Sequence, residues 1–379
     1  MNFLISSHYG DPHASLVAAA LHREGHTVTL WDVPESSEGR SITVSIDESG
    51  FAWEFEGRRY ASDHFDVIWP RRRRTPTIRT DLHEADREFA FTEVATYFDG
   101  LFSIAGPSTR MIHPPSIARD GESKLLQLAT ASRIGFKIPP SVIGNSRSRI
   151  TGFIDNLESI DARAIYKTFK PIAWQEEDRV RMKHTSVVRT ADIARNRYVE
   201  AVPGIYQMRI KKSHEVRATF FGDRELTVGI DSQRHPSAIE DWRSAFNLAG
   251  FLSPDNLPTD IRRMCRTMMD EMSLSIACFD FIVDEVGQFW FLELNQQGQF
   301  LWVEEQCEAI PMLDSFIDFM LEGGGATKRF SHSLADALTS PDYLALKEIF
   351  ERERFVEIST DMVLPRYTDH RTTRHGASA

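Results

Sequence analysis

The sequence predicts a mixed α+β protein built from two or three lobes, and three observations lead to this prediction. The chain has 379 residues, more than a single domain of about 150 residues needs. It opens with a strand, a helix and a second strand, an order typical of a small parallel sheet. Later stretches alternate apolar and polar residues and lead into amphipathic helical segments, so paired strands covered by helices are expected there as well.

Composition is that of an ordinary globular protein in water. Hydrophobic residues make up 41% of the chain and charged residues 26%, which allows a sizeable core. The formal net charge of -11 argues against non-specific nucleic-acid binding. The three cysteines form no CxxC pair, no signal peptide is evident, and no apolar run reaches the roughly 18 residues of a membrane helix. We therefore expect a cytoplasmic protein with neither a nucleic-acid nor a membrane partner.

The first lobe is predicted to contain several strands and two helices. Gly25 is a suitable residue to end the helix over 14–24, because glycine tolerates the left-handed conformation found after helices. A hairpin has its turn near 48–50, and an amphipathic surface helix covers 81–99. The predicted strand segments, in order, are MNFLISS, HTVTLWDV, SITVSID, FAWEFEG and FDVIWP.

From His113 on, the predicted elements change in character. A pair of prolines precedes a helix of about twenty residues, which Gly135 ends. IPPSVI, RAIYKTFKP and SVVRTADI each predict an extended segment, and LPTDIRRMCRTMMDEMSL predicts an amphipathic helix. The long stretch IYQMRIKKSHEVRATFFGDRELTVGI predicts two strands joined by a turn at Gly222 and Asp223. Beyond about residue 323, GGGATKR predicts a linker, PDYLALKEIFERERF a charged helix and RTTRHGASA a disordered end.

The segment FDFIVDEVGQFWFLELNQQGQF places polar side chains among aromatic and branched residues. It predicts a hairpin whose turn covers 284–287, so that Val283 pairs with Gln288 and Asp280 lies opposite Phe291. A turn one residue shorter would reverse which side chains share a face. The proposed register therefore decides what this hairpin can bind.

With the four-residue turn, Asp280, Glu293 and Asn295 share one face of the hairpin, together with Phe291. Buried carboxylates are disfavoured unless a cation or a hydrogen-bond donor neutralises them. Two carboxylates and an amide oxygen suit Mg²⁺ or Mn²⁺ better than zinc. The alternative is a structural one, in which Asp280 caps a segment and Glu293 meets an arginine at the surface.

Ordered segments of the chain resemble the ATP-grasp ligases, and most closely the ATP-grasp peptide ligases that make microviridin-like graspetides. HPPSIARDGESKLLQLATASRIGFKIP is similar to their NPPS…K…QL…GF.IP segment, with His113 in place of the usual Asn. IYQMRIKKSHEVRATFFGD resembles YQ…K..E.R.T..G, SQRHPSAIEDWR resembles SQ…DWR, and the hairpin segment resembles D…G.…FLE.N..GQ. WPRRRR resembles WYRRP less closely.

This resemblance covers about residues 1–322 and implies the ATP-grasp fold, an α+β architecture. An N-terminal α/β lobe would occupy 1–112, a central lid lobe 113–205 and a C-terminal catalytic lobe 206–322. An extension over 323–379 lies outside the resemblance, and the sequence does not decide its role.

The resemblance also implies an ATP site. Asp280, Glu293 and Asn295 would ligate the Mg²⁺ ions that bridge the phosphates of ATP. Lys124 and Lys167 would be the two lysines that reach the phosphates. Tyr206 and Gln207 would lie at the hinge, where backbone groups bind adenine. Without the resemblance, Lys124 would be read as a solvated helix lysine.

Two further residues would act on the reacting groups. By the resemblance, Lys212 and Arg217 would clamp phosphate or the developing acyl phosphate. The structural alternative for Arg217 is an exposed ion pair with Glu215 on the same strand.

Two basic segments are candidates for binding an anionic substrate, because arginine matches carboxylates bidentately. Arg71 and Arg72 align with the family's arginine pair, and the alternative is that the run 71–74 is a solvated strand edge. Asp241 and Arg243 belong to the DWR element, and the alternative there is a helix start with Asp241 as an N-terminal acid.

The family's chemistry gives these residues a common purpose. ATP would activate Asp or Glu side chains of a ribosomal precursor peptide as acyl phosphates, and an ester or amide crosslink within the peptide would follow. Such a reaction needs positioning and charge neutralisation rather than a protein nucleophile. The resemblance also implies a precursor peptide with a leader segment and an acidic core as partner, and a homodimer. Ester versus amide bonds and ring topology depend on the precursor and are not readable from this chain.

Two other functions stay open from the sequence. The first is an ATP-grasp ligase for amino acids or other small molecules, against which the SQ…DWR and arginine-pair elements argue. The second is a nucleotide-binding regulatory protein, against which the complete set of candidate site residues argues. The lid region over 175–190 contains no glycine, which favours the peptide ligases over ATP-grasp enzymes with a glycine-rich phosphate loop there.

Overall fold

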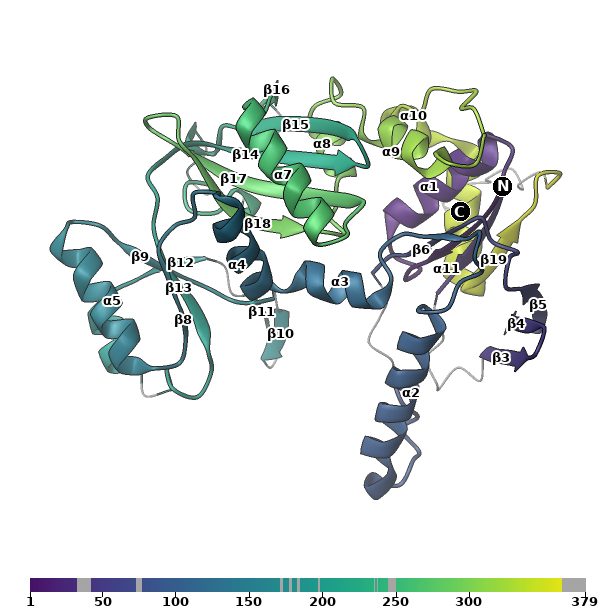
Figure 1. Ribbon diagram of the computed structural model, residues 1–379, viewed down its shortest axis with the longest axis horizontal. Helices are drawn as coiled ribbons and strands as arrows, with labels where there is room; N and C mark the ends of the chain where they lie inside the picture. Colours follow the sequence, from purple (N-terminus) through teal and green to yellow (C-terminus); the bar gives the residue numbers. More distant parts are fainter. Residues whose placement is uncertain are drawn as a thin grey trace, which may run out of the picture.

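The computed structural model describes residues 1–32, 42–72, 77–170, 173–176, 179–182, 185–196, 198–234, 236, 238–244 and 250–362. Figure 1 shows the elements in three groups along the long axis. A sheet built from the start and the end of the chain lies at one end, a larger sheet lies in the middle, and a small sheet with α5 lies at the other end.

The terminal sheet has five strands in the order β19-β2-β1-β6-β7. β1 pairs in parallel with both β2 and β6, which confirms the predicted strand–helix–strand opening. α1 begins where the Asp11 side chain accepts a hydrogen bond from the amide of His13, with Pro12 in its first turn. The elements are β1 (Asn2–Ser6), α1 (Pro12–Arg23), β2 (Thr27–Trp31), β6 (Val67–Pro70), β7 (Arg110–Met111) and β19 (Phe355–Ile358).

Two appendages accompany this sheet. A separate antiparallel sheet, in the order β3-β4-β5, contains the predicted hairpin with its turn near 48–50. α2 projects away from the body of the molecule, as expected for a surface helix (Figure 1). The bounds are β3 (Ile42–Asp47), β4 (Gly50–Phe55), β5 (Arg58–Ala61) and α2 (Arg87–Leu101).

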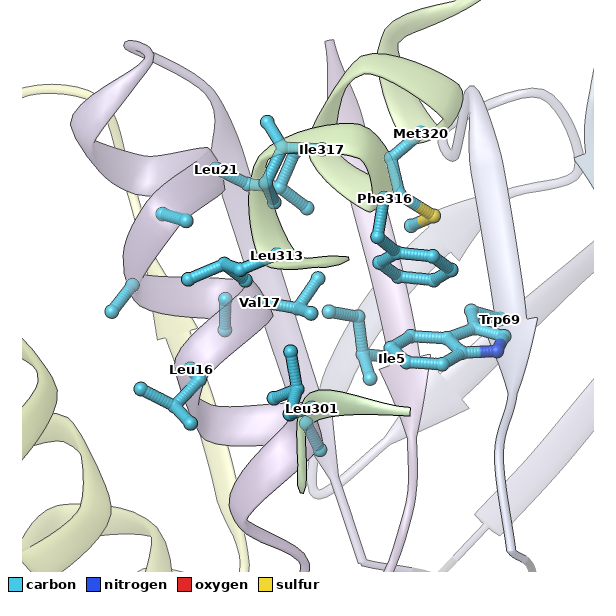
Figure 2. Close-up of a cluster of buried hydrophobic side chains, with 14 of the residues drawn as sticks. Ile5, Leu16, Val17, Leu21, Trp69, Leu301, Leu313, Phe316, Ile317 and Met320 are labelled. Atoms are coloured by element: carbon cyan, nitrogen blue, oxygen red, sulfur yellow. The ribbon is translucent and has the colours of Figure 1, made fainter. Parts of the chain in front are cut away.

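The largest hydrophobic core joins the terminal sheet to the middle of the molecule. Figure 2 shows Val17 and Leu21 of α1 facing Leu313 and Ile317 of α9, with Phe316 beside Trp69. Full burial of each such side chain is worth about 1.5–3 kcal/mol. This core fixes the terminal sheet relative to the helices that follow the predicted hairpin.

The middle sheet is antiparallel, in the order β16-β15-β14-β17-β18. α4 and α7 pack on one face through a second core, whereas α8 and α9 belong to the first core. The elements are β14 (Lys212–Phe221), β15 (Arg224–Ile230), β16 (Leu252–Asp255), α7 (Thr259–Glu271), β17 (Ile276–Asp284), β18 (Phe289–Asn295), α8 (Leu301–Gln306) and α9 (Met312–Leu321).

The third sheet is antiparallel, in the order β12-β9-β13-β8, and α5 and α6 cover it. A two-stranded pair, β10 with β11, occupies part of the predicted lid region. The elements are β8 (Ser141–Gly144), α5 (Arg147–Ser159), β9 (Ala164–Lys167), β10 (Ala173–Glu176), β11 (Arg179–Met182), β12 (Ser186–Val188), α6 (Thr190–Arg195) and β13 (Gly204–Met208).

Two sequence predictions need correction here. The long alternating stretch contains three strands rather than two, because β13 joins the third sheet while β14 and β15 belong to the middle one. The helix expected after the proline pair is interrupted at Ser123, whose extended backbone (ψ 101) ends α3 (Pro115–Glu122) and caps α4 (Lys124–Ile134). Gly135 does end α4, with φ 102.

The C-terminal segment returns to the start of the chain. After α10 (Leu334–Thr339), α11 (Pro341–Glu353) packs on α1, and β19 pairs antiparallel with β2. The Tyr60 hydroxyl of β5 donates to Glu357 of β19 at 2.7 Å. The predicted disordered end lies outside the described residues, and the lobe boundaries stay a prediction. Among the described residues, no helix is long and apolar enough to cross a membrane.

Candidate active site

The hairpin of β17 and β18 carries three of the candidate residues, in a register that differs from the predicted one. Val283 pairs with Phe289, and the expected pairing of Asp280 with Phe291 is wrong. A β-bulge at Leu292 adds one residue to β18, so that Asp280 pairs with Glu293. The turn is one residue longer than predicted and the bulge adds one more residue to β18. Together they shift the pairing by two residues, so the same side chains share a face as in the predicted register.

Asp280, Glu293 and Asn295 therefore share one face, as the sequence predicted. Asn295 Nδ2 donates to Asp280 Oδ2 at 3.1 Å, which makes Oδ1 the Asn295 atom that can ligate a cation. Phe291 pairs with Phe281 and belongs to the core on the other side of the sheet, not to this face.

Arg217 of β14 lies directly across from Asp280 in the sheet. Its Nη1 donates to Asp280 Oδ1 at 3.0 Å, and both side chains are largely buried. Burial raises the pKa of Asp280, although the charge of Arg217 acts in the opposite direction. The alternative of an exposed pair between Arg217 and Glu215 is wrong, because Glu215 pairs with Lys212 Nζ at 2.6 Å.

Glu293 is held between two cations. Lys124, the first residue of α4, donates through Nζ to Glu293 Oε2, and Arg243 Nη1 lies 3.4 Å from Glu293 Oε1. Burial alone would raise the pKa of Glu293, but the charges of Lys124 and Arg243 lower it to about 2. The interpretation of Lys124 as a solvated helix lysine is therefore wrong.

Arg243 lies in the short 3-10 turn Trp242–Ser244, which Asp241 orients. Arg243 Nε donates to Asp241 Oδ1 at 2.8 Å and Nη2 to Oδ2 at 2.9 Å. Within the described residues, the alternative of a helix start corresponds to this 3-10 turn, and Asp241 binds the guanidinium in addition to accepting a hydrogen bond from the Arg243 amide.

Lys167 ends β9 and faces the same region from the third sheet. Its Nζ donates to Gln207 Oε1 at 2.9 Å, and burial lowers its pKa to about 8. Tyr206 and Gln207 lie in β13 between β8 and β9, which pair with them on both sides. The Tyr206 side chain belongs to the core under α5. The adenine contact of their backbone groups stays a prediction.

A cavity of about 270 Å³ brings most of these residues together between the third and the middle sheet. The predicted residues that line it are Lys124, Lys167, Asp241, Arg243, Asp280, Glu293 and Asn295. Its walls also contain residues that the sequence did not single out: Ile165, Thr168, Thr185, Val216, Ile230, Ile282 and Leu292. For the five apolar residues the only sequence signal is apolar alternation, which looks the same in a core strand and in a cavity wall. The two threonines and Glu240, which also lines the cavity, give no signal of their own.

Arg71 and Arg72 lie outside this cavity. Arg71 is 1% exposed, and its Nε donates to Asp11 Oδ2 at 2.7 Å, so the solvated-edge alternative is wrong for this residue. Its Nη1 donates to Gln297 O at 3.1 Å, and the amide of Arg72 donates to Gln297 Oε1. Both residues thus contact the segment after β18, but the Arg72 side chain is exposed, so substrate binding by this residue stays a prediction. Residues 73–76 lie outside the described part.

The donor set fits a hard cation that completes its coordination with ligand oxygens. Within the described residues, no group of three or more His, Cys, Asp and Glu side chains has metal-site geometry. Two carboxylates and one amide oxygen are few ligands, which suits Mg²⁺ because it usually keeps water or phosphate in its shell. Zinc, which prefers histidine and cysteine, fits this set poorly.

No protein-family model and no curated protein matches the chain in sequence. Solved structures do match it, starting with a RiPP-associated ATP-grasp ligase of Chryseobacterium gregarium in complex with ADP and a leader and core peptide. That match has a TM-score of 0.75 and 24% identity, and covers 88% of this chain and 99% of the other.

Two further structures are similar. The macrocyclase MdnC of Microcystis aeruginosa, bound with precursor peptide MdnA, matches with a TM-score of 0.71 and 20% identity over 85% of this chain and 100% of the other. The ATP-grasp ligase PsnB, complexed with a precursor variant, Mg and ADP, matches with a TM-score of 0.64 and 17% identity over 84% and 97%. This chain therefore has the ATP-grasp fold.

Proposed function

We propose that the protein is an ATP-dependent ligase that forms ester or amide crosslinks within a ribosomal precursor peptide. The observation that carries this proposal is the convergence of Lys124, Lys167 and Arg243 with Asp280 and Glu293 around one cavity. Cations placed beside carboxylates suit the transfer of a phosphoryl group, where charge has to be neutralised on both sides. The solved structures of the same fold hold ADP and precursor peptides, which supports the choice of substrate.

The reaction would proceed in two steps. A substrate Asp or Glu carboxylate oxygen attacks the γ-phosphorus of ATP, the bond to the β–γ bridging oxygen breaks, and ADP leaves. A substrate hydroxyl or amine then attacks the acyl carbon, the bond to the phosphate oxygen breaks, and phosphate and a proton are released. The products are an ester or amide crosslink, ADP and phosphate.

The residues of this chain would bind and orient the reacting groups. Lys124 and Lys167 would neutralise phosphate oxygens, and Arg217 and Arg243 would hold the substrate carboxylate and its acyl phosphate. Asp280, Glu293 and Asn295 would hold Mg²⁺, or Mn²⁺ in its place, which when bound supplies charge neutralisation at the phosphates. Lys124 and Arg243 both form ion pairs with Glu293.

The proposal also covers the partner, the cellular compartment and the oligomeric state. The partner would be a peptide with a leader segment and an acidic core, the enzyme would act in the cytoplasm, and the sequence resemblance adds a homodimer. Arg71, which is buried, would then support the site through Gln297, and the exposed Arg72 would bind the anionic substrate.

The experiment that tests this function is an intact mass spectrum of the acidic peptide encoded beside the gene, after incubation with enzyme, ATP and Mg²⁺. We expect the loss of one or more waters. Glu293→Gln should lower crosslinking at least about 100-fold, because it removes a metal-binding charge at nearly constant volume. Glu285→Gln, in the exposed turn of the same hairpin, is the matched control and should keep full activity.

Two other results would favour a different function. An unchanged peptide mass together with ADP release in the presence of amino acids would favour a small-molecule ligase. No ADP release with either class of acceptor would favour a regulatory nucleotide-binding protein.

A further inference from the structure

The segment 296–301 connects Asn295 to α8, and we call it the tether loop. Parts of the chain that lie far away in the sequence contact it. At its centre, Gly298 leaves room that a side chain would not, because a Cβ there would come within 2.6 Å of Cys278 Sγ. Arg217 Nη2 donates to Gln299 O at 3.3 Å. The loop thus contacts the same guanidinium that pairs with Asp280.

The start of the tether loop is fixed by a buried histidine. Gln296 is 1% exposed, and its Oε1 accepts a hydrogen bond from His113 Nδ1 at 2.8 Å. Gly121 of α3 lies against it so closely that a Cβ at this position would be 2.7 Å from Gln296 Cγ. The Gln296 side chain is therefore confined to one orientation directly beside Asn295.

His113 also holds the start of the strand that carries Asp280. Its Nε2 accepts hydrogen bonds from the amides of Ser275 at 2.9 Å and Ile276 at 3.2 Å. Two donors at Nε2 require that the ring proton is on Nδ1, which is the atom that donates to Gln296. One imidazole thus joins the beginning of β17 to the residue after the end of β18.

The far end of the tether loop repeats this arrangement. His13 Nε2 accepts from the amides of Phe300 at 3.1 Å and Leu301 at 3.2 Å, and its ring stands edge-on to the Phe300 ring. Between the two histidines, Arg71 holds Gln297. His13 of α1 therefore holds the end of the loop, Arg71, which follows β6, holds its middle, and His113 holds its start.

We infer that His113 is a positioning residue that fixes Asn295 relative to Asp280 through Gln296 and thereby sets the affinity of the site for Mg²⁺ with nucleotide. The inference rests on the proposed function, because it assumes that these two residues bind the cation. Partners that orient metal ligands typically change metal affinity 10- to 100-fold when removed. The hydrogen bonds of His113 run to Gln296, Ser275 and Ile276, none of which lines the cavity, so its effect would pass through the loop.

Two substitutions separate the two bonds of the imidazole. In His113→Gln, the amide oxygen reaches the position of Nε2 and keeps an acceptor for Ser275 and Ile276, but the bond to Gln296 is lost. In His113→Asn, the amide nitrogen replaces Nδ1 and keeps the bond to Gln296. Asparagine also tolerates the left-handed backbone of this position, where φ is 50.

The measurement is the Mg²⁺ concentration that gives half-maximal binding of a fluorescent ADP analogue, without peptide and well below the melting temperature. We expect His113→Gln to raise it about tenfold. His113→Asn should stay within about threefold of the wild type while lowering the melting temperature, because two buried amides lose their acceptor.

Gln296→Met provides an independent test from the other side of the bond, at similar volume. It should also raise the Mg²⁺ requirement about tenfold, and the double variant with His113→Gln should be no worse than either single variant. Should both single variants keep the wild-type Mg²⁺ requirement, the positioning role is refuted. A wild-type enzyme that binds ADP without any response to Mg²⁺ would instead refute the proposed function, and this inference with it.

Discussion

The ammonium group of Lys167 lines the cavity and loses its charge close to neutral pH. Its pKa is lowered to about 8 because burial disfavours the charged form, and the charge of Glu293 opposes this only in part. Its contribution to phosphate binding is therefore complete below pH 7 and is lost as the pH rises through 8. We expect kcat/KM for ATP to fall about tenfold per pH unit above this value, because kcat/KM reports the free enzyme.

The control for this pH profile is Lys167→Arg, since a guanidinium stays charged throughout the range. The variant should show a flat profile from pH 7 to 9, whatever its absolute rate. An identical decline in both enzymes would assign the titration to another group.

Single residues also show where sequence reasoning ends. Glu293 and Asp280 are predictable, because a carboxylate in an apolar strand needs a cation. The sequence favours a substrate role for Arg71 and Arg72, yet Arg71 is buried and paired with Asp11, sixty residues earlier. A charge run shows how many charges it contains and not which of them meets a distant partner.

The hairpin of β17 and β18 decides which way the metal-binding side chains point. Leu292 is the extra residue of the bulge, and without it Glu293 and Asn295 would turn toward the core that contains Phe279 and Phe281. Deleting Leu292 should therefore bury an unpaired carboxylate and cost more than about 3 kcal/mol of unfolding free energy. We expect little soluble protein from this variant.

Deleting Gly325, which is exposed in the loop after α9, is the control and should cost about 1 kcal/mol or less, because the register of the hairpin does not depend on it. Urea unfolding of the two deletions measures the difference. Equal stability of both variants would mean that the bulge does not set the orientation of Glu293.

Elements were predictable to the extent that their signals are local. The helix end at Gly135 and the opening strand, helix and strand follow from residues within a few positions. The bulge cannot be predicted in this way, because it depends on how β18 contacts its neighbours. The amide of Phe291 donates to the carbonyl oxygen of Lys137, which lies 154 positions away in the chain. The break at Ser123 was missed although serine is a good N-cap, since helical periodicity continues across it.

At the scale of the whole molecule, the C-terminal segment completes the N-terminal sheet. Phe350 of α11 is fully buried in the core that contains α1, and β19 covers the edge of β2. β19 thereby becomes the edge strand in place of β2, and Arg58 and Tyr60 of β5 contact its Glu357 side chain. The resemblance ends before this segment, and for that reason its role was not readable from motifs.

Overall stability should depend on the two histidines that hold the tether loop. Burial lowers the pKa of His13 to about 3, helped by the charge of Arg71, and that of His113 to about 4. In the unfolded chain both titrate near about 6.5. Between these values the unfolded state binds more protons, so the free energy of unfolding falls as the pH falls from about 6.5 toward 4.

Each histidine contributes up to about 1.4 kcal/mol per pH unit to the slope of the unfolding free energy against pH. The interval from pH 6 to 5 isolates this contribution, because most carboxylates remain ionised there. His13→Gln and His113→Gln should each reduce the slope by about 1 kcal/mol per pH unit, since glutamine offers an acceptor that does not titrate. The control is His83→Gln, at an exposed position on the same chain. Denaturant unfolding at the two pH values measures these slopes. Unchanged slopes in both variants would show that the native protein admits protons to these rings, and that the tether loop does not require them neutral.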